Sequence, residues 1–444
     1  MTFRNLTPIL AVFILALSRS SAHAAITYDA ELNRAWVKDF PADLPCTLDN
    51  LLNMDEAGGW GKVILDEATN TYTIALDLWI GDHDGTETYF QVGGEREVTV
   101  VMKGDLVVHP FFIREVDEGL YYRAPRKINR LTLGSPKGAK VTLKFDCEKK
   151  NQYSLFVGSF PTDKRKKMER RGYGGELFAY NALITAATQD KARTWGGPGG
   201  MVYLCGNRTT LHNTTLSWAT KSLTYGMQNS PPLYIADVRN CVFEHALSGL
   251  INGKQLVRDS VFRHLDIAVM DYGSINAKLI GCTFENNKAN WELKYTKWGT
   301  TCIDCEVSPP LDKDIFRTAT TATIKTVRYP KLTLQRHVIV EVVGADGKPV
   351  EGADVRVTCD RKDPTAGLNT SQKTGADGRT PGRDAEKAIL LTDTVKQVTD
   401  TPNEPDVREY SYTVEASAPD QGKGRVEGYR PTGNWAVVRV KLEK

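Results

Sequence analysis

The chain has little net charge, no long apolar run and no closely spaced cysteine framework, and each shortage excludes a class of protein. Its formal net charge is only +3, which is too small to favour nucleic acid or an anionic membrane surface as a partner. No apolar stretch is long enough to span a bilayer, so no membrane span is expected. The 8 cysteines are scattered along 444 residues, which excludes a small domain held together by disulfides.

The N-terminus carries one short apolar stretch. Arg4 supplies a positive start, residues 9–17 are apolar, and Ala22-His23-Ala24 has the small-x-small pattern of a cleavage site. Residues 1–24 are therefore predicted to be a secretory signal peptide. The mature protein is expected to be soluble, and to be secreted, periplasmic or held at the cell surface.

A short sequence motif that is typical of a β-strand recurs through the middle of the chain, and we call it the phrase. The sequence NCVFEH at 240–245 returns as DSVFRH at 259–264 and as GCTFEN at 281–286, and a fainter copy, DCEV, follows at 304–307. The equivalent aromatic residues Phe243, Phe262 and Phe284 lie 19 and then 22 residues apart. Repeats of this length that are built of strands predict a solenoid, whose coils bury the three rings in one interior.

The cysteines of this phrase share one place in its copies. Because a free Cys packs as a small hydrophobe, Cys241, Cys282 and Cys305 are predicted to face inward. Adjacent coils lie about 4.8 Å apart, so a disulfide between Cys282 and Cys305 is the sterically allowed alternative. Cys302 and Cys305 form a CxxC, but no second pair completes a zinc site.

The middle of the chain lacks amphipathic helical stretches, which excludes a doubly wound sheet. A second kind of strand instead follows each copy of the phrase, at residues 248–252, 266–271 and 290–295. Strands that repeat in this way without crossover helices predict an all-β chain with a parallel β-helix over residues 61–310, capped by residues 25–60. No repeat is readable over residues 61–160. Early coils are expected there, and a separate small β unit is the alternative.

The sequence pattern changes after residue 310. Residues 311–334 are rich in Thr and contain Pro, as in a linker, and residues 335–444 alternate apolar and polar positions between Gly-containing turns. This alternation predicts a small β-sandwich domain. The segments DGKPVEGADVRV, TGADGRT and YTVEA resemble the transthyretin-like or carboxypeptidase-regulatory-like modules of secreted bacterial proteins. The resemblance implies a non-catalytic accessory domain.

The coils over residues 205–308 resemble the right-handed parallel β-helix of the pectin-lyase-like superfamily, because they share its strand, polar turn and strand pattern. The resemblance implies an extracellular polysaccharide, which could be acidic, as ligand or substrate. The superfamily includes lyases, hydrolases and surface proteins without catalysis, and the fold does not choose among them. The polygalacturonase pattern of an Asp-Asp pair together with Gly-His-Gly and Arg-x-Lys segments is absent, as is a recognisable pectate-lyase signature.

The second strand type is predicted to line the substrate groove that this superfamily commonly has. Aligning these strands by their turns places Gly249, Ile267 and Trp291 in one inward row and Glu292 in the alternating outward row. The turns before these strands are expected to stack one coil apart. The candidate catalytic residues on this face are Arg263, His264, Asp266, Glu292 and Lys294.

Two reactions are compatible with these residues. A uronate lyase needs a cation for the sugar carboxylate, here Arg263 or Lys294, and a base, here His264, Tyr295 or Lys294.

A glycosidase needs two carboxylates across the scissile bond, and Asp266 or Asp271 paired with Glu292 is what the alignment offers.

The same residues also have a structural interpretation. Stacked His245, His264 and Asn286 in turns of a β-helix often only satisfy backbone groups of the neighbouring coil, and outward Glu292 and Lys294 keep a face soluble. Two hypotheses are therefore carried forward. One is a polysaccharide lyase or glycoside hydrolase, and the other is a non-catalytic glycan-binding or cell-envelope protein.

Three further segments carry weaker signals. Residues 162–171 are basic, as in a solvated loop or a docking patch for an acidic polysaccharide. Residues 82–85 (DHDG) resemble a calcium loop, but the ligand series stops after two carboxylates, so an ordinary turn and no cofactor are predicted. The glycine-rich residues 196–200 lack the Lys-Ser/Thr of a phosphate loop. The expected partner is an extracellular polysaccharide, and a monomer is expected.

Overall fold

The computed structural model describes most of the chain after residue 23. The described residues are 24–81, 87–109, 128–146, 155–158, 175–186, 202–205, 208–218, 221–225, 235–251, 255–271, 277–294, 299–307, 315–317, 331–361, 370–383, 387–398 and 405–444. They divide between two compact units, residues 1–226 and 227–444. The fold is all-β, as the sequence predicts, with one α-helix and one short 3-10 turn among the described residues.

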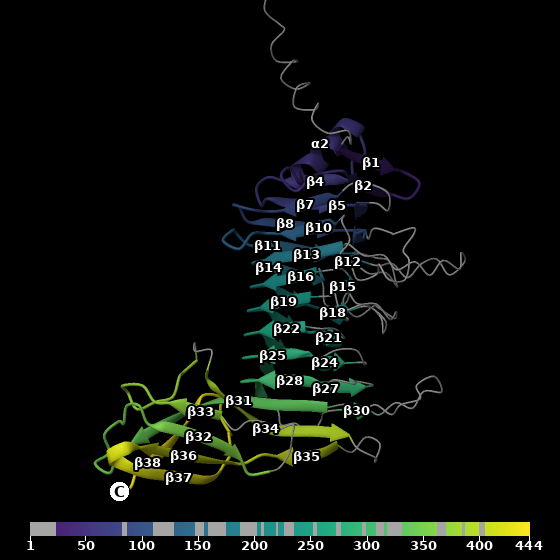
Figure 1. The fold of residues 1–444 in the computed structure, drawn as a ribbon. Coiled ribbons are helices and arrows are strands. Elements are labelled where there is room, and N and C mark those ends of the chain that lie inside the picture. The colour runs from purple at the N-terminus through teal and green to yellow at the C-terminus, as the bar shows by residue number, and fades with distance from the viewer. Residues whose placement is uncertain are drawn as a thin grey trace, which may run out of the picture. The chain divides into compact units, whose positions relative to one another are not determined.

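The first unit is built from three sheets, and within each sheet the strands stack in sequence order (Figure 1). Sheet A contains β1 (Ala25–Asp29), β2 (Arg34–Lys38), β6 (Asp77–Ile80), β9 (Leu106–Val108), β12 (Leu155–Gly158), β15 (Val202–Cys205) and β18 (Lys221–Tyr225). Sheet B contains β3 (Cys46–Thr47), β7 (Thr88–Val92), β10 (Asn129–Leu133), β13 (Gly175–Tyr180) and β16 (Arg208–His212). Sheet C contains β4 (Val63–Asp66), β5 (Thr71–Ile74), β8 (Val98–Met102), β11 (Val141–Phe145), β14 (Ala182–Ala186) and β17 (Thr215–Ser217).

From β7 onward the chain visits these sheets in the fixed order B, C, A, and the paired strands of successive coils run parallel. In sheet B, for example, Leu131 of β10 lies between Phe90 of β7 and Leu177 of β13. All three side chains are buried, because alternate residues of each strand face one interior. This is the arrangement of a parallel β-helix, and it extends to residues 61–160, where no repeat is readable.

The helix α2 (Leu48–Gly58) lies near the start of the first unit. Thr47 caps its N-terminus reciprocally with Asn50, and Gly59 ends it in the left-handed conformation at φ 63°. Its buried side chains Leu48 and Leu51 pack near β3 and β4. The neighbouring strands β1 and β2 form an antiparallel hairpin, so the segment 25–60 differs in structure from the coils that follow.

The second unit begins with coils of the same kind. Sheet B contains β19 (Ile235–Arg239), β22 (Gln255–Arg258), β25 (Lys278–Ile280), β28 (Thr300–Ile303) and β31 (Lys331–Val343). Sheet C contains β20 (Val242–Glu244), β23 (Val261–Arg263), β26 (Thr283–Glu285) and β29 (Glu306–Val307). Sheet A contains β21 (Ser248–Ile251), β24 (Ile267–Asp271), β27 (Ala289–Lys294) and β30 (Ile315–Arg317).

The three repeated aromatic residues form one column inside these coils. The ring of Phe262 stacks on Phe243 at 4.8 Å and on Phe284 at 5.0 Å, nearly parallel to both. All three side chains are fully buried, and Phe284 also contacts the ring of Trp291. The prediction that these rings share an interior is confirmed.

The strand that carries each copy of the phrase, predicted from the sequence at residues 233–243, 255–262, 277–284 and 301–307, is divided into a sheet B strand and a sheet C strand. A left-handed residue separates sheet B from sheet C in each coil, at Asn240, Asp259, Gly281 and Asp304. Such a residue bends the chain sharply without a loop, and Asn, Asp and Gly adopt this conformation at least cost. In the first unit, Asn181 and Asn213 do the same between β13 and β14 and between β16 and β17.

The repeated cysteines are buried, as predicted, and are free thiols. Each directly follows a left-handed corner and donates a hydrogen bond to the carbonyl two residues earlier, from Cys241 to Arg239 at 3.2 Å and from Cys282 to Ile280 at 3.6 Å. Ser260 fills the same place and donates to Arg258 at 2.7 Å. The shared role is therefore to close the corner, and burial raises the pKa of the Cys282 thiol.

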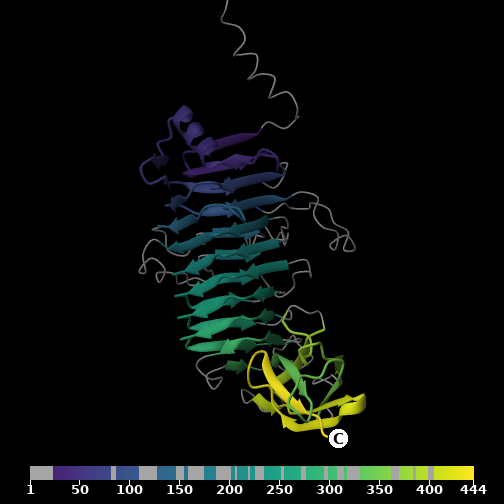
Figure 2. The same cartoon turned by 90° about the vertical axis from the view of Figure 1, so that its left-hand side faces the viewer.

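The C-terminal part is a β-sandwich of two mostly antiparallel sheets (Figure 2). One sheet contains β31, β34 (Ile389–Val398), β35 (Pro405–Glu409) and β38 (Ala436–Lys441). The other contains β33 (Thr370–Lys373), β32 (Asp354–Cys359), β36 (Tyr412–Ala418) and β37 (Gly422–Tyr429), with the 3-10 turn η4 (Pro419–Gln421) before β37. Val340, Val357 and Val414 lie in the core between the sheets.

The long strand β31 belongs to both the coils and the sandwich. Its first residues pair in parallel with β28, and its later residues pair with β34 and β38. Because β30 and the start of β31 lie within residues 311–334, part of the segment expected to be a linker is strand.

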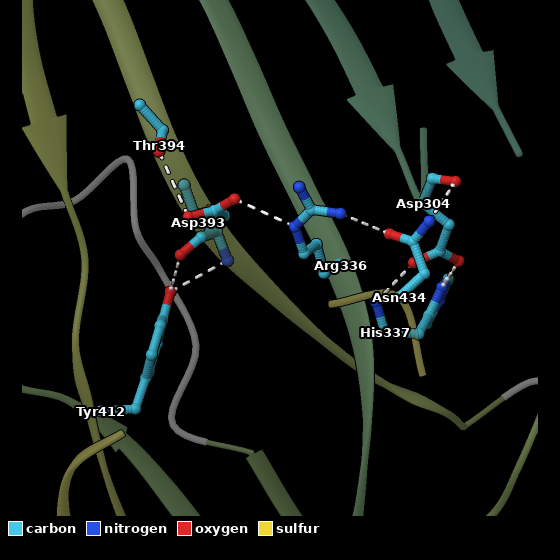
Figure 3. A network of polar contacts seen from close by, with 8 residues as sticks. Asp304, Arg336, His337, Asp393, Thr394, Tyr412 and Asn434 are labelled. Atoms are coloured by element: carbon cyan, nitrogen blue, oxygen red, sulfur yellow. Dashed lines mark hydrogen bonds and ion pairs between the residues drawn. The ribbon is translucent and has the colours of Figure 1, made fainter. Parts of the chain in front are cut away.

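A polar network holds this junction together (Figure 3). The carboxylate of Asp304 accepts from the backbone N–H of His337 at 2.7 Å and lies 2.6 Å from its Nδ1. The ring of Trp435 stacks on His337 at 4.5 Å, and Asn434 donates to the Asp304 carbonyl at 2.9 Å. Arg336 continues the network from Asn434 toward the sandwich sheet. The last coil and the sandwich are therefore joined by directional contacts.

No helix in the described part of the chain has the length and apolar content needed to cross a membrane.

Candidate functional site

The predicted catalytic residues lie in three different places on the coils of the second unit. Arg263 is on sheet C, where its guanidinium pairs with Glu244 at 2.7 Å. His264 is the left-handed corner between β23 and β24 and is exposed. Asp266 follows it and pairs with Lys288 at 2.7 Å. Both ion pairs link neighbouring coils across a partly exposed surface, as a structural role would require.

The register predicted for the second strand type is wrong by one or two residues. Ile267 pairs with Ser248 and Ala289, whereas Trp291 pairs with Val269. The neighbours of Glu292 are therefore Met270 and Ile315 rather than Ala268.

The burial of Glu292 also differs from the expectation. Its side chain is only 4% exposed, so it is not part of a solvated outer row. Lys294 lies in β27, where its backbone pairs with Arg317, and its side chain is outside the described set. Asp271 ends β24 and likewise has no described side chain, and Tyr295 lies outside the described residues.

Two predicted corner residues do stack. The rings of His245 and His264 lie 5.0 Å apart and nearly parallel, one coil from each other. Burial lowers the pKa of His245, Glu244 opposes this effect, and the nearby His264 and Arg263 add to it. A stacked pair of this kind disfavours a charge on the His245 ring.

We expect this stack to make the coils less stable in mild acid. Because the pKa of folded His245 lies below its ordinary value of 6.5, the unfolded chain binds the proton first as pH falls. Stability is therefore fully present above that value and declines below it. Denaturant unfolding between about pH 8 and pH 5 should show a smaller decline for His245→Asn, since Asn occupies the equivalent corner at Asn286. An unchanged decline would contradict this account.

The described chain carries another ordered group of side chains, which the sequence analysis missed. It lies on the outer face of sheet B in the first unit, where β7, β10, β13 and β16 stack on one another (Figure 1). The register of these strands places their outward residues in rows across the coils. We call it the aromatic face. Its described side chains are Tyr89, Gln91, Arg130, Thr132, Glu176, Phe178, Tyr180, Thr210 and His212, and the backbone of Arg208 lies in the same row as Glu176. Residues that alternate with these, such as Phe90, Leu131 and Leu177, fill the interior.

Arg130 lies at the centre of the aromatic face. Its guanidinium carbon is 4.9 Å from the ring centroid of Tyr89 and 4.3 Å from that of Phe178. Its Nε and Nη2 donate to one carboxylate oxygen of Glu176 at 2.9 and 2.6 Å. Glu176 is only 6% exposed. A charge-assisted pair packed between rings fixes the positions of all four side chains.

The remaining members extend the face to either side. The Tyr89 hydroxyl donates to Glu87 at 3.0 Å, and burial together with this carboxylate raises the Tyr89 pKa. The edge of Tyr180 meets the ring of His212 at 5.5 Å. Gln91 donates to the carbonyl of Gly134 at 3.0 Å, which ties neighbouring coils together. The face thus presents half-buried rings whose positions are set before any ligand arrives.

The outward residues of sheet B in the second unit differ in kind. Where side chains are described, they include Asp237, Leu256, Lys278 and Thr301. None of these is aromatic. Because both sets occupy the same sheet position, coil construction alone does not require rings there. The concentration of rings in the first unit therefore needs a reason other than folding.

A second ring cluster lies on sheet A of the first unit. Trp36 and Trp79 meet at 4.6 Å, and the Arg34 guanidinium lies 3.9 Å from the Trp79 centroid. The row continues through Val107 and Phe156, which are 3% and 1% exposed. Trp36 and Trp79 are themselves half-buried, and they lie on a different sheet from the aromatic face.

Several predicted segments cannot be placed. Residues 82–85, 162–171 and 196–200 lie outside the described residues. Within the described ranges, no group of three His, Cys, Asp or Glu side chains is arranged to hold a metal ion.

Comparison with known proteins gives no assignment. No protein-family model, no curated protein and no solved structure matches the chain.

Proposed function

We propose that the protein binds an extracellular polysaccharide along the aromatic face of the first unit. The observation that carries the proposal is the fixed group of Tyr89, Arg130, Glu176 and Phe178, in which two half-buried rings flank a guanidinium neutralised by a buried carboxylate. The polysaccharide class follows from the expected export of the chain and from the chemistry of the face.

The chemistry of the face suits sugar rings. A pyranose has an apolar C–H surface and a rim of hydroxyls, so it needs both flat apolar groups and hydrogen-bonding groups. Aromatic rings supply the first at little cost in conformational entropy when their positions are already fixed. The Thr132 hydroxyl supplies such a group beside them, as does the carbonyl oxygen of the Gln91 amide, whose nitrogen donates to the Gly134 carbonyl.

The dimensions of the face favour a polymer. Its residues span four consecutive strands of sheet B, which is about 14 Å along the stack at the usual spacing between strands. A flat, extended row of contacts matches a chain of sugars better than a small molecule, which binds preferentially in a concave pocket.

Binding is supported more strongly than catalysis. The predicted catalytic residues Arg263 and Asp266 are each held in an ion pair, and Glu292 is buried. In these positions Arg263, Asp266 and Glu292 are engaged in ion pairs or buried, which favours a structural role over contact with a substrate.

The proposal predicts that the rings carry the affinity. Phe178→Ala and Tyr89→Ala should each weaken binding about tenfold, which corresponds to about 1.4 kcal/mol, because each removes one stacking surface. Affinity gel electrophoresis against a panel of soluble polysaccharides, followed by titration calorimetry on those that bind, measures this loss.

The matched control is Ile280→Ala, a half-buried outward residue of sheet B in the second unit. Its affinity should stay within about twofold of the parent protein. If no polysaccharide retards the parent protein, or if the ring variants bind as well as the parent, the proposal fails.

A further inference from the structure

We infer that the aromatic face selects an uncharged glycan and disfavours polyuronates. This inference rests on the proposed function and narrows its ligand class. It departs from the expectation of an acidic polysaccharide. The argument depends on how the charges of the face are already used.

The central cation of the face is occupied. Arg130 gives two hydrogen bonds to the same oxygen of Glu176, at 2.9 and 2.6 Å. Arg130 has further N–H donors, but a uronate carboxylate that reached them would meet a guanidinium whose charge is already balanced by a fixed and buried carboxylate. A pair that is already made therefore contributes little attraction for an anion.

The two rings limit access to the same cation. The ring centroids of Tyr89 and Phe178 lie 4.9 and 4.3 Å from the guanidinium carbon, so both rings occupy space beside the cation. Its in-plane Nε and Nη2 hydrogens point to Glu176. The guanidinium acts as part of the aromatic face, because it packs beside both the Tyr89 ring and the Phe178 ring.

The other charged side chain described beside the aromatic face is acidic. Glu87 accepts the Tyr89 hydroxyl at 3.0 Å and adds negative charge at that end of the face. The negative charge of Glu87 repels the carboxylates of a polyanion bound beside it. The aromatic face presents ring surfaces together with the neutral side chains of Gln91 and Thr132. These groups suit the hydroxyls of a sugar rather than carboxylates.

The test compares neutral and acidic polymers on the full-length mature protein. The neutral probes are a mixed-linkage β-glucan, a xylan and a galactomannan, and the acidic probes are polygalacturonate and alginate. We expect binding to at least one neutral polymer, with an affinity that changes less than about twofold between low and high salt. Tighter binding to a polyuronate, weakened by salt, would overturn the inference while leaving the proposed function intact. Failure of every polymer to bind would overturn both.

A charge variant tests the cause. Glu176→Gln leaves Arg130 without its anion, so we expect polyuronate binding to rise at least about fivefold at low salt and to fall again at high salt. An unchanged polyuronate affinity in folded Glu176→Gln would show that the neutralised guanidinium is not what excludes anions. Arg208, whose backbone lies next to Glu176 in sheet B, provides the second variant. If the parent protein binds polyuronate and Arg208→Ala abolishes that binding, the ligand charge lies at Arg208 and the inference is overturned.

Discussion

Replacing Phe262 by Ala is expected to lower the free energy of unfolding of the coils by about 3–5 kcal/mol. Phe262 is the middle ring of the interior column, with Phe243 at 4.8 Å and Phe284 at 5.0 Å. Its removal leaves a cavity bounded by two rings that belong to different coils. Neither ring can close the gap alone, since each is held by strands that pair one spacing away.

Denaturant unfolding of the purified variant measures this loss. The matched control is Val261→Ala, the preceding residue of the same strand, which is only half-buried and should cost about 1 kcal/mol or less. Equal losses for the two variants would contradict a ring column inside the coils. Phe262→Leu should lie between them, because it keeps part of the buried volume.

Replacing Asp304 by Ala is expected to cost about 2–4 kcal/mol at the junction between the coils and the sandwich. The carboxylate of Asp304 holds the His337 backbone N–H at 2.7 Å and the ring nitrogen at 2.6 Å (Figure 3). Its side chain is 9% exposed, so water does not readily replace the lost partner. Ala also tolerates the left-handed conformation of this residue, φ 52°, less well than Asp does.

Two further variants separate these causes by the same unfolding measurement. Asp304→Asn keeps the left-handed preference and one acceptor, so it should lose less than half as much as Asp304→Ala. Asp259→Ala removes a carboxylate from the equivalent corner two coils earlier, where the side chain is exposed and φ is 49°. It should cost only the corner strain of about 1–2 kcal/mol. If Asp259→Ala costs as much as Asp304→Ala, the contacts to His337 do not stabilise the junction.

The parts of the fold that the sequence revealed are those in which one residue type recurs at one coil position. The Phe column and the cysteines were visible for this reason. The corners were not recognised, because a single left-handed residue such as Asn240 turns the chain without the glycine-rich or proline-rich loop that normally marks a turn. Two strands were therefore read as one.

The register error has a similar origin. The predicted alignment took the turn before each strand as its reference and so brought Trp291 beside Ile267. In the structure each sheet A strand begins five residues after its Phe, at Ser248, Ile267 and Ala289, because the corner has the same geometry in every coil. A count from the Phe residues would have found this register.

The aromatic face escaped notice because its strands are far apart in the sequence. Arg130 and Glu176 lie 46 residues apart yet adjoin in space, whereas the readable repeats are about half that length. Each of these strands ends at a corner glycine or asparagine, as in FAYNA at 178–182 and TLHNT at 210–214. That recurring ending was the available signal.

The most direct test of the account is to map the bound polysaccharide on the protein surface. Carbene footprinting with and without a neutral polysaccharide that binds should show lower labelling at Tyr89, Phe178 and Tyr180, with Ile280 unchanged. Protection that instead falls on the coils around His264 and Asp266, with the aromatic face labelled as strongly as in the free protein, would contradict the proposed binding face.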